Sequence, residues 1–81
     1  MDTKVAVISI IVNERKATEQ LNALLHEYGQ YIIGRLGLPY KEKNINIICI
    51  AVDAPEEKVN SLTDAIDQIP DINATVTYAK Q

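Results

Sequence analysis

The sequence predicts an α+β domain in which four strands and two helices follow one another in the order βαββαβ. Two near-continuous aliphatic runs, residues 5–12 and 45–52, are each about one strand long and apolar on both alternating faces. Each run is followed by apolar residues at helical spacing, and a weaker strand-like segment comes after each helix. This order is typical of the ferredoxin-like fold, whose four-stranded antiparallel sheet carries two helices on one face.

The first half of the chain begins with a strand over residues 4–12. Polar residues 13–16 end this strand, and Asn13 is expected to cap the helix that follows. That helix presents one apolar stripe, and Gly29 is a natural place for it to stop. The stripe consists of Ala17, Leu21, Leu24, Leu25 and Tyr28.

The second and third strands are predicted to form a hairpin. The second, residues 31–38, is interrupted by Gly34 and Gly37, and Pro39 is expected to end it. The polar residues 40–44 are few enough for an antiparallel turn into the third strand, residues 45–52.

The second helix is predicted to begin around residues 53–57, because Pro55 suits a first turn and the acidic residues there favour the positive helix end. Pro70 closes this helix, and residues 72–79 form the last strand. Its apolar stripe consists of Val59, Leu62, Ile66 and Ile69.

In this topology the first and third strands are central, and the second and fourth are edges. The first and third strands are the two most aliphatic segments. Each has apolar residues on both faces, so when the helices cover one face, the opposite face remains apolar and uncovered. We therefore expect the chain to associate through its sheet into a homodimer or a homotetramer. A face partly covered by loops, and edge-strand pairing between subunits, are the alternatives.

Composition sets further bounds on the 81-residue chain, which we expect to form one domain over residues 1–81. The net charge of −3 and the scattered basic residues argue against direct nucleic-acid binding. The lone cysteine, Cys49, allows no intrachain disulfide, and with one histidine it allows no zinc cluster. No cofactor is expected. The start of the chain carries no secretory signal and no apolar run could span a membrane, so the expected location is the cytoplasm.

Two segments could bind a ligand. In the segment over residues 34–40, Arg35 could hold a carboxylate or phosphate, Gly37 would allow close approach, and Tyr40 adds a hydroxyl. The other interpretation of this segment is a bent edge strand with a solvated arginine. Asn13 and Arg15 lie where the first strand meets the first helix, either as ligand contacts or as a solvated loop.

Other residues bear on three further functions: metal binding, RNA binding and acyl-phosphate hydrolysis. His26, near the end of the first helix, is a weak metal candidate that would need ligands from a neighbouring subunit. RNA-recognition domains share the strand order but stack bases on aromatic residues of the central strands, which this chain lacks. Acylphosphatases need an arginine in the first loop and an asparagine on a central strand. Arg15 and Asn46 could supply that pair, but the glycine-rich phosphate loop is missing.

Three stretches resemble the small stand-alone proteins known as iron-only hydrogenase system regulators: VAVISIIVNERK, LLHEYGQYIIGRLGLPY and INIICIAVDAPEEKV. That family is similar to ACT domains and to the C-terminal domain of the nickel-responsive repressor. The resemblance implies an ACT-like ferredoxin fold, oligomeric assembly and a regulatory, non-enzymatic role.

The chain departs from both relatives of that family at their ligand sites. His26 matches the region of the repressor's helix-borne histidine, but a GRLG segment replaces its paired histidines, and Cys49 lies deeper in the third strand. Amino-acid-binding ACT domains usually carry a glycine at the first strand–helix turn, where this chain has Asn13 to Arg15. Neither a nickel site of that kind nor an amino-acid effector is therefore expected.

The sequence thus predicts a non-enzymatic regulatory module that binds a small effector near its subunit interfaces. The expected effector contacts are Asn13, Arg15, Arg35, Gly37 and Tyr40. A protein-interaction module without a ligand and a small hydrolase are the alternative functions.

Overall fold

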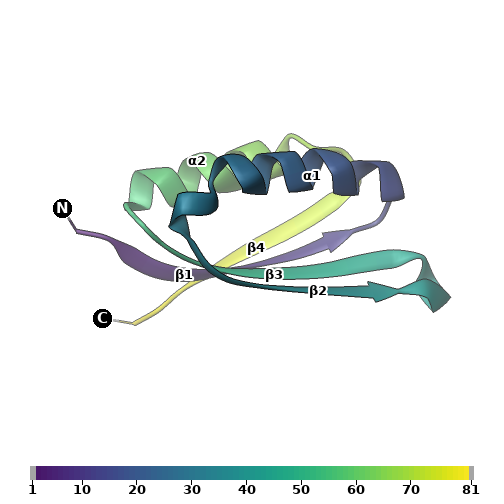
Figure 1. Ribbon diagram of the computed structural model, residues 1–81, viewed down its shortest axis with the longest axis horizontal. Helices are drawn as coiled ribbons and strands as arrows, with labels where there is room; N and C mark the ends of the chain where they lie inside the picture. The colour runs from purple at the N-terminus through teal and green to yellow at the C-terminus, as the bar shows by residue number, and fades with distance from the viewer. Residues whose placement is uncertain (1, 81) are drawn as a thin grey trace.

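The computed structural model of the chain describes residues 2–80, and its elements follow the predicted βαββαβ order (Figure 1). Short 3₁₀ turns follow α1 and β2. The elements are β1 (Lys4–Val12), α1 (Arg15–Glu27), a turn at Gly29–Tyr31, β2 (Ile32–Tyr40), a turn at Lys41–Lys43, β3 (Ile45–Ala54), α2 (Glu56–Asp67) and β4 (Ile72–Tyr78).

The four strands form one antiparallel sheet in the order β2-β3-β1-β4, so the two aliphatic strands are central, as predicted. The register is continuous through the middle of the sheet, where Ile8 on β1 lies between Ile50 on β3 and Val76 on β4. Central strands need apolar side chains on both faces only when both faces become covered. In this chain the helices cover one face (Figure 1).

The hydrophobic core lies between that face and the two helices. Alternation along β1 directs Ile8 and Ile10 into it, and the α1 stripe supplies Leu21 and Leu25. Burying each such side chain stabilises the fold by roughly 1.5–3 kcal/mol. The core residues are Ala6, Ile8, Ile10, Val12, Ala17, Leu21, Leu25, Ile48, Ile50, Val52, Ala54, Val59, Leu62 and Ile66.

The prediction that Pro39 ends the second strand is wrong. β2 runs on to Tyr40, with Pro39 opposite Asn46 and Tyr40 opposite Ile45 on β3. Proline is tolerated there because β2 is an edge strand. No further strand pairs with its outer side, so a missing N–H on that side costs no hydrogen bond of the sheet. A register shift between Ile32 and Gly34 marks a bulge near the start of the strand.

The predicted cap at Asn13 is also wrong. Glu14 occupies the N-cap position of α1 and makes no side-chain cap. Asn13 instead joins two strands: its backbone N–H donates to the Asp71 carbonyl at 2.8 Å, and its Nδ2 donates to Asn73 Oδ1 at 2.9 Å. The Asn13 side chain therefore bonds to a residue 60 positions away instead of capping the adjacent helix.

The helices found in residues 2–80 are all too short or too polar to cross a membrane.

Candidate functional site

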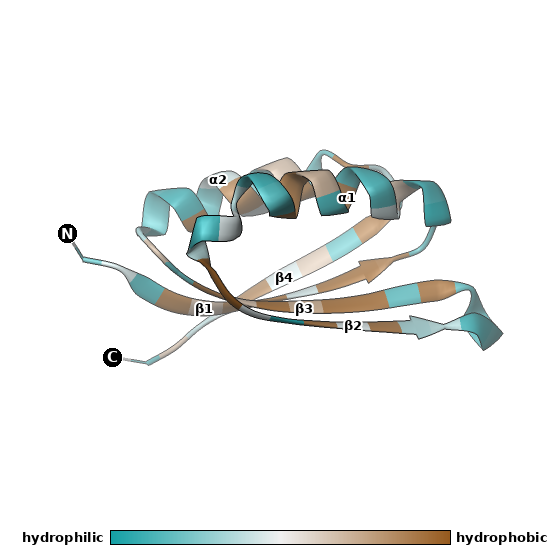
Figure 2. Cartoon of the chain, viewed as in Figure 1, coloured by the Kyte–Doolittle hydropathy of each residue, from teal (hydrophilic) through white to brown (hydrophobic). Residues whose placement is uncertain are grey.

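The sheet face opposite the helices is apolar and open to solvent. Alternation and register place there the residues that we call the bare face. Several are large and exposed: Leu36 is 63% exposed, Leu38 54%, Val7 43% and Ile11 41%. Figure 2 shows hydrophobic residues concentrated along β1, β2 and β3. The bare face consists of Val5, Val7, Ser9, Ile11, Gly34, Leu36, Leu38, Tyr40, Ile45, Ile47, Cys49 and Ala51.

The border of the bare face is polar but almost uncharged. On β4, the side chains that share this face are Asn73, Thr75 and Thr77, opposite Ile11, Ser9 and Val7. Asp53, opposite Val5, is a carboxylate at one end. A second surface can therefore approach the middle of this face without desolvating a charge.

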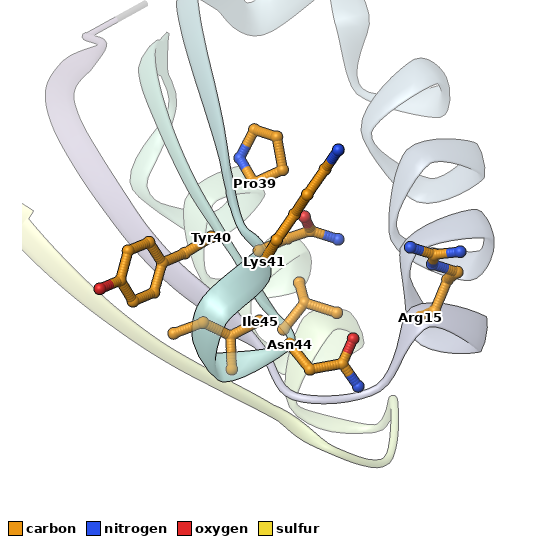
Figure 3. Close-up of a pocket in the computed structure, with 8 residues that line it drawn as sticks. Arg15, Pro39, Tyr40, Lys41, Asn44 and Ile45 are labelled. Carbon is orange, nitrogen blue, oxygen red and sulfur yellow. The ribbon is translucent and has the colours of Figure 1, made fainter.

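A pocket of about 280 Å³ lies at the end of the sheet where α1 begins and the chain turns from β2 into β3 (Figure 3). It is lined by Val12, Arg15, Pro39, Tyr40, Lys41, Asn44, Ile45 and Asn46. Figure 3 shows Arg15 on α1 and Lys41 on the turn after β2, so the two cationic side chains come from different sides of the pocket.

The charge of this pocket is positive. Arg15 and Lys41 line it, and none of its described lining residues is acidic. In residues 2–80 the ion pair that forms joins Lys4 and Glu56, on other elements, so neither pocket cation is neutralised by a salt bridge. Asn46 Nδ2 donates to Thr18 Oγ1 at 3.1 Å, which fixes that amide beside α1.

The structure brings together two of the five predicted effector contacts. Arg15 and Tyr40 both line the pocket, although the Tyr40 ring points away from Arg15 in Figure 3. Asn13, Arg35 and Gly37 do not line it. The prediction that these five residues contact an effector stays a prediction.

Arg35 and Gly37, two of the predicted contacts that do not line the pocket, lie on the helix-facing side of β2. Arg35 lies on the helix-facing side of β2 and its Nη2 donates to Asn22 Oδ1 on α1 at 2.6 Å. Gly37 also faces that side, opposite Ile48, and a Cβ added there would meet nothing within 4 Å.

Sequence reasoning missed Lys41 and Asn44 as pocket residues. The polar residues 40–44 predict a turn but do not indicate a ligand site. Asn44 adopts φ 56° and ψ 40°, a left-handed conformation that asparagine tolerates, and this sends the chain back into β3. Asparagine at the end of a short hairpin turn was the available signal.

His26 and Cys49, the residues with metal-binding side chains, lie on different sides of the sheet. His26 is exposed in the last turn of α1, whereas Cys49 lies on the bare face opposite Leu36. Across residues 2–80, no group of three or more His, Cys, Asp or Glu side chains is placed to hold a metal ion.

Fold and surface together define a small α+β protein of the ferredoxin-like class. The chain belongs to the TM1266-like family, whose model matches residues 4–76 and whose description reads "Iron-only hydrogenase system regulator, putative". The uncharacterized protein TM1266 from Thermotoga maritima is similar to it, with a TM-score of 0.93 and 26% identity over 98% of this chain and 100% of that chain.

More distant solved structures share the fold alone. A protein of unknown function from Galdieria sulphuraria matches with a TM-score of 0.73 at 11% identity, over 99% of this chain and 47% of that one. CPII, a nitrogen regulatory PII-like protein from Thiomonas intermedia K12 solved with ADP, AMP and bicarbonate, matches at 0.57 and 19% identity, over 99% and 100%. No curated protein sequence matches the chain.

Proposed function

We propose that this chain is a non-enzymatic regulatory module of an iron-only hydrogenase system, which works in the cytoplasm as a homo-oligomer and binds a small effector. The family description supports the regulatory role. The bare face is the observation that supports assembly, because it leaves Leu36 and Leu38 more than half exposed. A contiguous apolar patch of this kind is unusual on a soluble monomer.

The bare face and its polar border on β4 are together large enough for a dimer. The four strands hold seven to ten residues each, and at about 3.3 Å per residue and about 4.8 Å between strands the whole sheet face has a projected area of roughly 550 Å² per copy. Two copies then bury roughly 1,100 Å² in projection, and more once the relief of the side chains is included. A specific interface needs about 1,000 Å² or more in total.

The distribution of large and small side chains on the bare face favours a second copy of the same chain as the binding partner. Large side chains, Leu36 and Leu38, stand on the edge strand β2, whereas small ones, Ser9, Cys49 and Ala51, occupy the middle of β1 and β3. In a two-fold arrangement the leucines of one copy can pack over the small side chains of the other. The lack of charge in the middle of the face removes repulsion between identical surfaces.

Sedimentation velocity at micromolar concentration tests the assembly. Wild-type protein should sediment above the 9.0 kDa of one chain. Leu36→Asp should sediment as a folded monomer, because burying its carboxylate in the interface is costly, while the exposure of Leu36 in the single chain makes the change tolerable for folding. Asn60→Asp, which adds the same charge on the exposed side of α2, should leave the assembly intact.

Two results would contradict assembly through the bare face. One is a wild-type protein that stays a single chain throughout the micromolar range. The other is a Leu36→Asp variant that assembles as wild type does, which would move the interface to another surface. Circular dichroism on each variant confirms that the fold is retained.

One observation favours a second function, hydrolysis of acyl phosphates. Arg15 and Asn46, the pair that this chemistry would need, line the same pocket. The loop before α1 lacks a phosphate-cradling glycine run, and Asn46 already donates to Thr18. Release of phosphate from acetyl phosphate, abolished in Arg15→Gln, would establish this activity. An equal rate in both proteins would rule it out.

A further inference from the structure

The positive charge of the pocket beside α1 is produced by the fold rather than by composition. The chain as a whole carries 11 acidic and 8 basic residues. Both pocket cations have an acidic neighbour in the sequence, Glu14 beside Arg15 and Glu42 beside Lys41. Each cation is therefore only one residue away from a carboxylate along the chain.

The fold sends both carboxylates elsewhere. Glu14 lines a different hollow, together with Lys16 and Pro70. The Glu42 carboxylate accepts a hydrogen bond at 3.1 Å from the Tyr40 hydroxyl, at the end of a ring that points away from Arg15 (Figure 3), and Glu42 does not line the pocket. Two cations thus remain on the pocket wall with no carboxylate among its lining residues, which is an arrangement that attracts an anion.

The remaining groups of the pocket suit an oxyanion. A guanidinium binds phosphate or carboxylate through two parallel N–H bonds, and an ammonium adds a point charge. Asn44 and Asn46 add amide groups to the same wall. The volume of about 280 Å³ is at the lower end of ligand pockets, which favours a small metabolite over a nucleotide or a peptide.

We propose that this pocket binds a small dianionic oxyanion, a phosphate ester or a dicarboxylate, through Arg15 and Lys41. The proposal names the effector class of the proposed regulatory function and rests on it for its regulatory meaning. Tyr40 and Ile45 line the pocket and also lie on the bare face. A ligand bound in the pocket would therefore lie beside residues of the proposed subunit interface.

The test is a titration of ¹⁵N-labelled full-length protein with inorganic phosphate and, separately, with succinate, at constant ionic strength set by chloride. Saturable shifts should appear at the backbone amides of residues 12–15 and 41–46. Arg15→Gln and Lys41→Gln should each raise Kd about tenfold or more, because each removes a charge-assisted contact.

Matched controls separate a built site from general attraction. Lys16→Gln and Lys43→Gln remove the same charge from the same helix turn and the same 3₁₀ turn, at residues that do not line the pocket. They should leave Kd unchanged. Saturation by phosphate alone identifies a phosphate ester, and saturation by succinate alone identifies a dicarboxylate.

The proposal is overturned if neither anion saturates, or if Lys16→Gln weakens binding as much as Arg15→Gln does. Sedimentation of the same samples distinguishes this failure from that of the proposed function. An oligomer without anion binding removes the effector and leaves a protein-interaction module. Anion binding by a monomer preserves the pocket and removes the assembly.

Discussion

Leu21 and Leu36 are the same residue type in opposite surroundings: Leu21 is fully buried between α1 and the sheet, and Leu36 is 63% exposed on the bare face. We expect Leu21→Ala to lower the free energy of unfolding by about 2–5 kcal/mol, through lost burial and the cavity left behind. Leu36→Ala should cost far less in a monomer. Urea denaturation of both variants at low protein concentration measures the difference, and equal losses would contradict this division of the sheet faces.

Lys4 and Glu56 form an exposed ion pair that predicts a pH dependence. Lys4 Nζ donates to Glu56 Oε1 at 2.7 Å, and this hydrogen bond, with the charge of the carboxylate, raises the pKa of Lys4 above its ordinary value of 10.5. A raised pKa in the folded state means that the contribution is fully present below about pH 10.5 and is lost as the pH rises through the raised value. The effect is small because both side chains are about half exposed.

Urea unfolding of Glu56→Gln measures this contribution. The variant should be slightly less stable than wild type at about pH 8. The difference in stability should narrow in high salt, and also as the pH rises from about 10.5 through the raised pKa of Lys4. Glu57→Gln, one residue further along α2, removes the same charge and leaves the Lys4 contact intact. An identical response of the two variants would show that the ion pair contributes nothing.

Single residues divide into those whose position is decided locally and those decided by distant contacts. The stripe residue Leu21 was predictable from helical spacing. Asn13 was not, because its amide bonds to Asn73 rather than to the adjacent helix. Lys41 and Asn46 entered the pocket only through the register that sets Pro39 opposite Asn46, and no local pattern in the sequence encodes that register.

At the scale of elements, hydrophobic content predicted the sheet order and the ends of β1, but not the end of β2. β1 matched its predicted bounds, because polar residues flank an aliphatic run. β2 was predicted to stop before Pro39, since proline cannot donate to a ladder. An edge strand makes that donation unnecessary, so the end of the strand depends on tertiary position, which the local pattern does not contain.

The glycines of β2 are not required by the fold of the single chain. Among the described residues no glycine has positive φ, and a Cβ at Gly37 or Gly34 would meet nothing within 4 Å. We expect Gly37→Ala to stabilise the protein by about 0.4–1 kcal/mol, since it restricts the unfolded chain. Phosphate affinity should not change, because Gly37 does not line the pocket.

Gly34→Ala is the matched control for that substitution, because Gly34 faces the bare side opposite Ala51. It should give a similar gain in a monomer but alter self-association. Thermal unfolding and phosphate titration of both variants check this. A fall in phosphate affinity confined to Gly37→Ala would place Gly37 in the effector site after all.

At the scale of the molecule, the number of helices available to cover the sheet predicted the exposed apolar face, which no sequence motif indicated. Two helices cover one face of a four-stranded sheet, so aliphatic residues on both faces of β1 and β3 had to leave one set exposed. The pocket could not be foreseen in the same way. It forms where α1, the end of β1 and the β2–β3 turn converge. Arg15 and Tyr40, two of the five expected effector contacts, both line it because the loop after β1 meets the hairpin there.

Assembly through the bare face makes stability depend on concentration. If folding is coupled to association, the thermal midpoint of the wild-type protein should rise with protein concentration, because mass action favours the folded oligomer. Leu36→Asp should unfold at a midpoint that does not depend on concentration, and Asn60→Asp should follow wild type. Differential scanning calorimetry over a hundredfold range of concentration, about 2 μM to 200 μM, makes this measurement. A wild-type midpoint that stays constant over that range, with the same value as Leu36→Asp, would mean that the exposed leucines stabilise no assembly.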